Sequence, residues 1–159
     1  MVHSHSGFTV VTVPVIKGDW SITFFNPDQG LFSEVMEMEA RVRGYFQAWL
    51  EQDLEAVKEI FAENVVYSEC YGPEYRGLSQ IIRWFTEWNE RGRVLEWRIK
   101  RALQENKTLV AEWYFQCRYE GVIDGFDGVS IVDFDDEMKI VKLREFQSKA
   151  EHYFPYGEA

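Results

Sequence analysis

The spacing of apolar residues changes at Gly92 from a helical to a strand pattern, and this order leaves few folds open to the chain. Before Gly92, apolar residues recur every three or four positions in three separate stretches, which is the spacing of one face of an α-helix. After Gly92, apolar and polar residues alternate over long runs, which is the pattern of β-strands. Three helices interleaved with one strand, followed by a long antiparallel meander, predict an α+β fold with the helices packed on one face of a sheet.

Local signals place the three predicted helices. Ser33 can cap the first helix. Its apolar stripe consists of Val35, Met38, Val42, Tyr45, Phe46 and Trp49. Asp53 is expected to cap a short second helix that ends at Asn64, and residues 65–71 then form a strand. Gly77 opens the third helix.

Four further strands are expected after the third helix. They cover residues 93–104, 109–119, 128–134 and 139–146, with a turn at 105–107 and an acidic turn at 135–137. One face of the first strand carries Leu95, Trp97, Ile99, Arg101 and Leu103. One face of the second carries Ala111, Trp113, Phe115, Cys117 and Tyr119. We therefore expect Trp97 and Trp113 to face the helices together.

The first 30 residues differ from the rest of the chain. Residues 8–25 contain two extended segments around Lys17-Gly18-Asp19, a plausible β-hairpin, and residues 26–30 have the composition of a turn. We interpret residues 1–30 as an N-terminal extension and residues 31–159 as a single domain, since this length suits one hydrophobic core.

Composition excludes several classes of partner. The chain has 17 Lys and Arg against 27 Asp and Glu, a net charge of −10, and phosphate backbones need clustered cations, so nucleic acid is not an expected partner. No apolar run is long enough to span a membrane, and the N-terminus does not resemble a signal peptide. The two cysteines follow no metal or disulfide spacing. These features predict a cytoplasmic protein without a membrane partner.

No cofactor or metal is expected. His3 and His5 lie near the N-terminus and His152 near the C-terminus, and no ligand triad is fixed by local spacing. The chain also has no glycine-rich phosphate loop and no dinucleotide-binding fingerprint. The chain contains 6 Trp, 8 Tyr and 12 Phe. So many large side chains must either fill a core or line a cavity.

Two segments resemble the nuclear transport factor 2-like superfamily, which includes steroid isomerases and SnoaL-like polyketide cyclases. They are YFQAWLEQDLEAVKEIFAENVVYSECYGPEYRGLSQIIRWF, residues 45–85, and DGVSIVDFDDEMKIVKLREF, residues 127–146. In the second segment Met138 stands where members commonly have a turn glycine. The resemblance implies a cone: three N-terminal helices packed on a strongly curved antiparallel sheet that encloses a deep, mostly apolar cavity. It also implies a homodimer formed through the sheet.

The resemblance to steroid isomerases assigns three positions. In those enzymes a strand carboxylate shuttles the proton, while a helix tyrosine and a protonated acid on a later strand stabilise the enolate oxygen. The matching positions here are Glu69 for the base, Tyr45 for the oxyanion donor and Ser130 for the third acid. Serine can donate a hydrogen bond, but it cannot act as a buried neutral acid. Tyr45 also lies in an amphipathic stripe, where a tyrosine can simply be part of the core.

The residues around Glu69 leave its role open. If Tyr67 and Glu69 face inward, desolvation raises the proton affinity of the carboxylate and makes it a usable base near neutral pH. If Ser68 and Cys70 face inward instead, Glu69 is solvated, and it can also pair with Arg76.

A cavity of this kind would bind a small hydrophobic or aromatic molecule. Its predicted ligand-binding residues are Trp49, Tyr67, Trp84, Trp97, Trp113, Phe115 and Ser130, although each aromatic could equally belong to a solid core. The function predicted from these residues is that of a cofactor-free isomerase, cyclase or dehydratase acting by carboxylate proton transfer. The alternative is a non-catalytic ligand-binding or dimeric protein-interaction module of the same fold.

Overall fold

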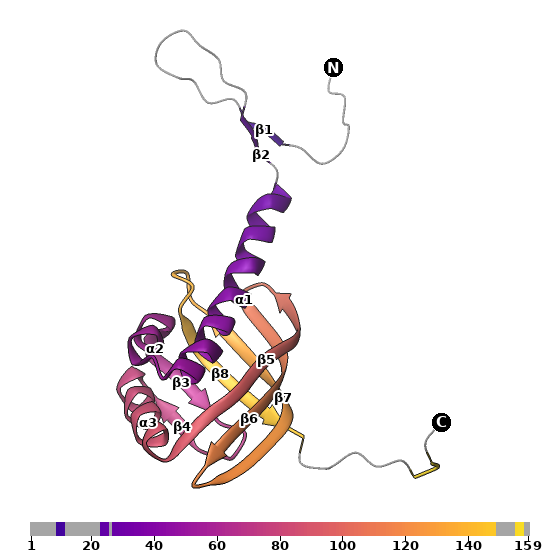
Figure 1. Cartoon of the computed structure of the whole chain (residues 1–159). Helices are drawn as coiled ribbons and strands as arrows, with labels where there is room; N and C mark the ends of the chain where they lie inside the picture. Colours follow the sequence, from indigo (N-terminus) through magenta and orange to yellow (C-terminus); the bar gives the residue numbers. More distant parts are fainter. Residues whose placement is uncertain (1–8, 12–22, 26, 149–154, 158–159) are drawn as a thin grey trace. The chain divides into compact units, whose positions relative to one another are not determined.

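The computed structural model describes residues 9–11, 23–25, 27–148 and 155–157, and the side chains of residues 37–148 and 155–157 (Figure 1). The chain divides into two compact units, Met1–Glu37 and Met38–Ala159. In the first unit, β1 (Thr9–Val11) pairs antiparallel with β2 (Thr23–Phe25), as expected for the predicted hairpin. The predicted turn at Lys17-Gly18-Asp19 lies outside the described residues.

The second unit confirms the predicted α+β architecture. Its sheet has the strand order β4-β3-β8-β7-β6-β5 and is covered on one face by helices (Figure 1). The helices are α1 (Pro27–Glu51), α2 (Leu54–Ile60) and α3 (Leu78–Arg91), with the residues of α1 from Met38 belonging to this unit. The strands are β3 (Phe61–Ser68), β4 (Glu74–Arg76), β5 (Gly92–Glu105), β6 (Thr108–Tyr119), β7 (Val122–Phe134) and β8 (Ile140–Gln147).

One pair of strands departs from the antiparallel prediction. β3 pairs with β8 in parallel, with Tyr67 opposite Leu143, whereas every other neighbouring pair among the described strands of this sheet is antiparallel. Strands joined by short turns are antiparallel. β3 and β8 are far apart in the sequence, so no turn fixes their relative direction, and the sheet is mixed.

The predicted helix ends are partly correct. Asp53 caps α2, accepting a hydrogen bond from the Ala56 N–H at 3.0 Å, and Gly77 caps α3 with φ of 83°. The first helix begins at Pro27 rather than at Ser33, because proline suits the first turn, where its missing N–H costs nothing. α2 ends at Ile60, so the predicted end at Asn64 is wrong and that residue lies in β3.

Two bulges change the predicted inner face of β5. The pairing with β6 shifts register between Val94 and Glu96, and again between Ile99 and Arg101. Each extra residue reverses the alternation of side chains beyond it. Trp97 is buried as predicted, but Leu95 and Leu103 are 37% and 58% exposed, so their predicted inward placement is wrong.

The turn between β7 and β8 keeps its geometry without glycine. Met138 has φ of 60°, in the left-handed region that costs an L-residue about 1 kcal/mol. Asp135 Oδ1 accepts hydrogen bonds from the N–H groups of Glu137 and Lys139 at 2.9 and 2.8 Å, which holds the turn.

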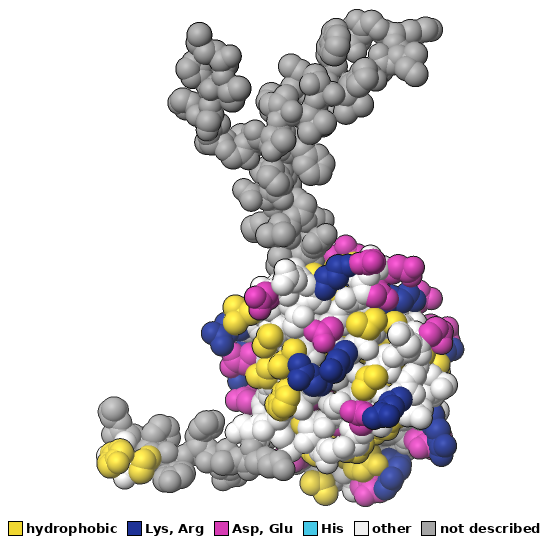
Figure 2. All heavy atoms as spheres, turned by 180° about the vertical axis from the view of Figure 1, so that it is seen from behind, with side chains coloured by type: hydrophobic (Ala, Val, Ile, Leu, Met, Phe, Trp, Pro, Cys, Tyr) yellow, Lys and Arg dark blue, Asp and Glu magenta, His cyan; other side chains and the backbone are white. Residues whose placement is uncertain are grey.

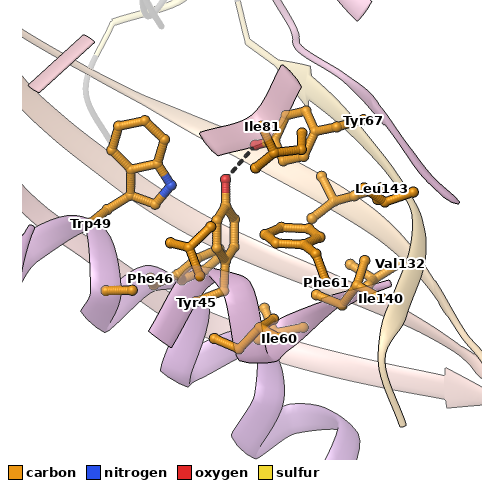
Figure 3. Close-up of a cluster of buried hydrophobic side chains, with 14 of the residues drawn as sticks. Tyr45, Phe46, Trp49, Ile60, Phe61, Tyr67, Ile81, Val132, Ile140 and Leu143 are labelled. Atoms are coloured by element: carbon orange, nitrogen blue, oxygen red, sulfur yellow. Dashed lines mark hydrogen bonds between the residues drawn. The ribbon is translucent and has the colours of Figure 1, made fainter. Parts of the chain in front are cut away.

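The core lies between the helices and the sheet. Buried side chains of α1 pack against Phe61 and against side chains of the central strands, among them Val132, Ile140 and Leu143 (Figure 3). The α1 members are Met38, Val42, Tyr45, Phe46 and Trp49, which confirms the part of the predicted stripe that the structure describes.

The surface mixes both signs of charge. Lys and Arg are interspersed with Asp and Glu over the face shown in Figure 2, with apolar side chains exposed between them. Among the described residues, no helix is long and apolar enough to cross a membrane. The homodimer through the sheet stays a prediction.

Candidate functional site

A cavity of about 1030 Å³, open to solvent on one side, is bordered by parts of α1, α3 and the curved sheet. Half of its 22 lining residues are aromatic. These are Trp49, Tyr67, Tyr71, Tyr75, Trp84, Trp88, Trp97, Trp113, Phe115, Tyr119 and Phe126. Such a volume fits a small organic molecule held mainly by apolar contacts.

All six aromatic residues that the sequence nominated for the wall border this cavity, namely Trp49, Tyr67, Trp84, Trp97, Trp113 and Phe115. Ser130 does not border it. Ser130 is completely buried on β7 and its Oγ accepts the indole N–H of Trp113 at 2.8 Å, so it lies behind the wall. Five further aromatic residues line the cavity without having been predicted to, because their contribution depends on how separate strands and helices converge. They are Tyr71, Tyr75, Trp88, Tyr119 and Phe126.

Glu69 faces the cavity. It follows β3 directly, where Tyr67 is completely buried, so the inward face is the one that contains both residues. Tyr75 Oη lies 3.5 Å from Glu69 Oε2, and Arg76 pairs with Glu74 rather than with Glu69. Burial raises the pKa of Glu69 to about 7, against the opposing effect of the hydrogen bond from Tyr75. The carboxyl group therefore changes protonation near neutral pH.

Tyr45 lies one layer behind the cavity. It is completely buried, and its hydroxyl donates a hydrogen bond to the hydroxyl of Tyr67 at 2.9 Å (Figure 3). The indole nitrogen of Trp49 points toward the hydroxyl of Tyr45 (Figure 3). Burial raises the pKa of both tyrosines well above the usual value, which keeps both phenols protonated. Of these two tyrosines, Tyr67 borders the cavity, and Tyr45 contacts it from behind.

Glu145 is the acid that the sequence analysis missed. It lies on β8, directly opposite Ser130 in the register of β7 and β8, and it borders the same cavity as Glu69. Burial, and secondarily the charge of Glu69, raise the pKa of Glu145 to about 8, while hydrogen bonds with Tyr67 and Ser130 act in the opposite direction. Most of this carboxyl is therefore protonated at pH 7.

A carboxyl group therefore lines the cavity from the strand next to Ser130. Glu145 Oε1 is buried and has no hydrogen-bond partner among the described residues. The signal that could have found it is the alternation of Glu145 with the buried Leu143, which puts a carboxyl group on the inward face of the last strand.

No metal-binding cluster is found in the part of the chain that the structure describes, where no three His, Cys, Asp or Glu side chains gather suitably. His3, His5 and His152 lie outside the described residues. Cys117 and Cys70 both border the cavity, and burial raises the pKa of the Cys117 thiol, which keeps it protonated.

Comparisons with known proteins agree on family and fold. A family model described as a SnoaL-like domain matches residues 42–143. An LEH-like epoxide hydrolase from M. tuberculosis is 17% identical with a TM-score of 0.65, over 71% of this chain and 84% of that one. An NTF-2 like protein of unknown function from Burkholderia xenovorans is 16% identical with a TM-score of 0.62, over 77% and 91% of the two chains. No curated protein matches.

Proposed function

The chain belongs to the SnoaL-like domain family, and from that premise we propose that it is a cofactor-free isomerase, cyclase or dehydratase that transfers a proton on a small hydrophobic carbonyl compound. One observation carries the proposal: two carboxyl groups, Glu69 and Glu145, border one aromatic cavity, and burial raises the pKa of both. Paired carboxyl groups of this kind divide the roles of base and acid between them.

Glu69 is the proposed base. With a pKa of about 7, a large part of this group is ionised at neutral pH while remaining basic enough to accept a proton from carbon next to a carbonyl. The protonated Glu69 then returns the proton at another carbon in an isomerisation, or to a departing hydroxyl group in a dehydration. Either outcome leaves the enzyme in its starting state.

Glu145 and Tyr67 are the proposed stabilisers of the enolate oxygen. Negative charge develops on that oxygen as Glu69 removes the proton, and the protonated Glu145 donates a hydrogen bond to it. Tyr67 accepts a hydrogen bond from Tyr45, which orients the Tyr67 hydroxyl and leaves its own proton for Glu145 or the substrate oxygen. Ser130, whose Oγ accepts the indole N–H of Trp113, lies opposite Glu145 on the neighbouring strand and lowers the pKa of its carboxyl group by a hydrogen bond.

Hydrogen–deuterium exchange tests this proposal before the substrate is known. A panel of hydrophobic ketones is incubated with the protein in deuterated water, and α-carbon exchange is followed by NMR. The protein should accelerate exchange of at least one ketone, and Glu69→Gln should reduce that rate by about 10²- to 10⁴-fold. Glu63→Gln, which alters an exposed carboxylate on β3 outside the cavity, is the matched control.

Two outcomes would overturn the proposal. One is exchange by Glu69→Gln at the rate of the unaltered protein. The other is a panel in which no ketone exchanges faster with the protein than in buffer alone.

A further inference from the structure

The exposed mouth of the cavity carries an excess of negative charge. Its exposed ionisable residues are Glu87, Glu90, Arg91, Glu120 and Asp124, so four carboxylates face one guanidinium, a formal excess of three negative charges. Cations are scarce here, because Arg91 is the single Lys or Arg among the described residues that line the cavity. This bias is local, since the surface elsewhere mixes both signs (Figure 2).

Two of these carboxylates have no ion-pair partner. Arg91 pairs with Glu120 and lies 5.2 Å above the ring of Tyr119, so the one cation at the mouth is already neutralised. Glu87 pairs with Arg83 at 2.7 Å. Glu90 and Asp124 form no ion pair with any described residue. Their negative potential therefore acts on whatever enters the cavity.

Below the mouth, the wall presents aromatic rings. Tyr75 stacks on Trp84 at 4.6 Å between ring centroids, and Trp88 packs against Tyr119 at 5.4 Å. The face of an aromatic ring carries partial negative charge and attracts an organic cation by about 0.5–2 kcal/mol. A carboxylate or phosphate group would meet the same rings and the unpaired acids without a compensating cation.

Three buried polar atoms of residues that line the cavity have no hydrogen-bond partner among the described residues. The indole nitrogen of Trp49 points toward the Tyr45 hydroxyl (Figure 3), and the other two atoms independently indicate a ligand. Trp97 is 7% exposed, and its indole Nε1 donates to no described residue. Glu145 Oε1 is buried and likewise unpaired. An unsatisfied buried polar group costs about 1–3 kcal/mol, so a bound molecule with a donor and an acceptor at this depth would relieve both.

We propose that the cavity selects a hydrophobic molecule that carries a positively charged ammonium group at the mouth and a carbonyl or hydroxyl group at the depth of Glu145 and Trp97. The inference rests on the proposed function in one respect, that this molecule is the substrate whose carbonyl meets the two acids. The same carboxylates and ring faces disfavour hydrophobic anions such as acyl phosphates.

A pair of unreactive probes of nearly equal shape tests the charge preference. Benzyltrimethylammonium and neopentylbenzene differ in having a cationic nitrogen or a neutral carbon at the branch point, and 4-tert-butylbenzoate supplies the anion. Binding is followed by quenching of tryptophan fluorescence at about 20 mM salt. The ammonium probe should bind about tenfold more tightly than the neutral one, and the anion should bind most weakly. Raising the salt to about 0.5 M should reduce the preference, because the mouth charges are exposed.

A double substitution locates the preference. Glu90→Gln with Asp124→Asn should reduce affinity for the ammonium probe by about fivefold and leave the neutral probe unchanged. Asparagine preserves the acceptor that Asp124 offers to the Gly125 N–H. The control, Glu63→Gln with Glu105→Gln, removes the same charge from exposed positions outside the cavity and should leave the preference intact.

The inference is wrong if the neutral probe binds as tightly as the ammonium probe at low salt, if neither probe binds, or if the control variant reduces the preference as much as the mouth variant. These probes are inert, so the result is independent of turnover. Loss of exchange in Glu69→Gln with no charge preference would overturn only this inference, and a charge preference without any exchange would overturn only the proposed function.

Discussion

Two parts of the interior contain the same types of side chain and are packed differently. Around Tyr45, the rings and aliphatic side chains close completely, and Phe61 and Leu143 are 1% and 0% exposed. Around Trp84 and Phe115, comparable rings border an open cavity. Aromatic side chains are therefore common to both regions and do not by themselves identify a binding site. The hollow part is distinguished by the carboxyl groups on its wall, whereas the polar atoms of the closed part, such as the Tyr45 hydroxyl, are hydrogen-bonded to one another.

The largest expected effect separates the two parts by stability. Phe61 contacts Tyr45 and Tyr67 edge to face, so Phe61→Ala leaves a cavity in a closed core and should lower the free energy of unfolding by about 3–5 kcal/mol. Phe115→Ala, the same change on the cavity wall, should cost roughly half of that, because part of the ring already faces empty space. Urea denaturation measures the free energy of unfolding of both variants. Equal losses of stability would contradict the distinction between a closed core and an open cavity wall.

The carboxyl groups on the cavity wall should make the stability of the protein depend on pH. In the unfolded chain Glu145 has an ordinary pKa of 4.5, and in the folded protein burial raises its pKa to about 8. Between these values the folded state binds more protons than the unfolded state, so the free energy of unfolding should fall as pH rises from about 4.5 to about 8. Glu69 adds a change of the same sign that ends near pH 7.

Glu145→Gln should remove most of this dependence. At pH 9 the variant should be more stable than the unaltered protein by up to about 5 kcal/mol, and at pH 4 nearly equal to it, because the protonated acid and the amide are then alike in charge. Glu63→Gln serves as the control. Parallel stability curves for the unaltered protein and Glu145→Gln would show that this carboxyl group is not desolvated.

The smallest effect concerns the support of Glu145. Ser130→Ala leaves the Trp113 indole N–H without its acceptor and should cost about 1 kcal/mol of stability. The Ser130 hydroxyl also lowers the pKa of Glu145, so its removal should raise that pKa. The rate of α-carbon exchange is expected to fall above about pH 8 as Glu145 loses its proton, and in Ser130→Ala this fall should move to higher pH. An unchanged pH profile of the exchange rate would show that Ser130 does not affect the pKa of Glu145.

The candidate site was only partly predictable. The inward direction of Glu69 follows from its two-residue spacing to Tyr67, and both residues line the cavity as the alternation allowed. Tyr45, predicted as the oxyanion donor, does not line the cavity, whereas Tyr67 does, because a helix stripe indicates which residues face inward and not how deep they lie. Glu145 was missed, because its relation to Ser130 exists only through the pairing of β7 with β8.

The sequence by itself determined the order of helices and strands and several of their ends. Helical and strand periodicity, the Asp53 cap and the Gly77 start are set by neighbours within a few residues, so they can be read without a fold. Tertiary structure decided the rest: the parallel pairing of β3 with β8, the two bulges that turn Leu95 and Leu103 outward, and the shared cavity of Glu69 and Glu145. Each of these depends on strands distant in sequence that meet in the sheet, and the desolvation that raises the pKa of both acids arises only there.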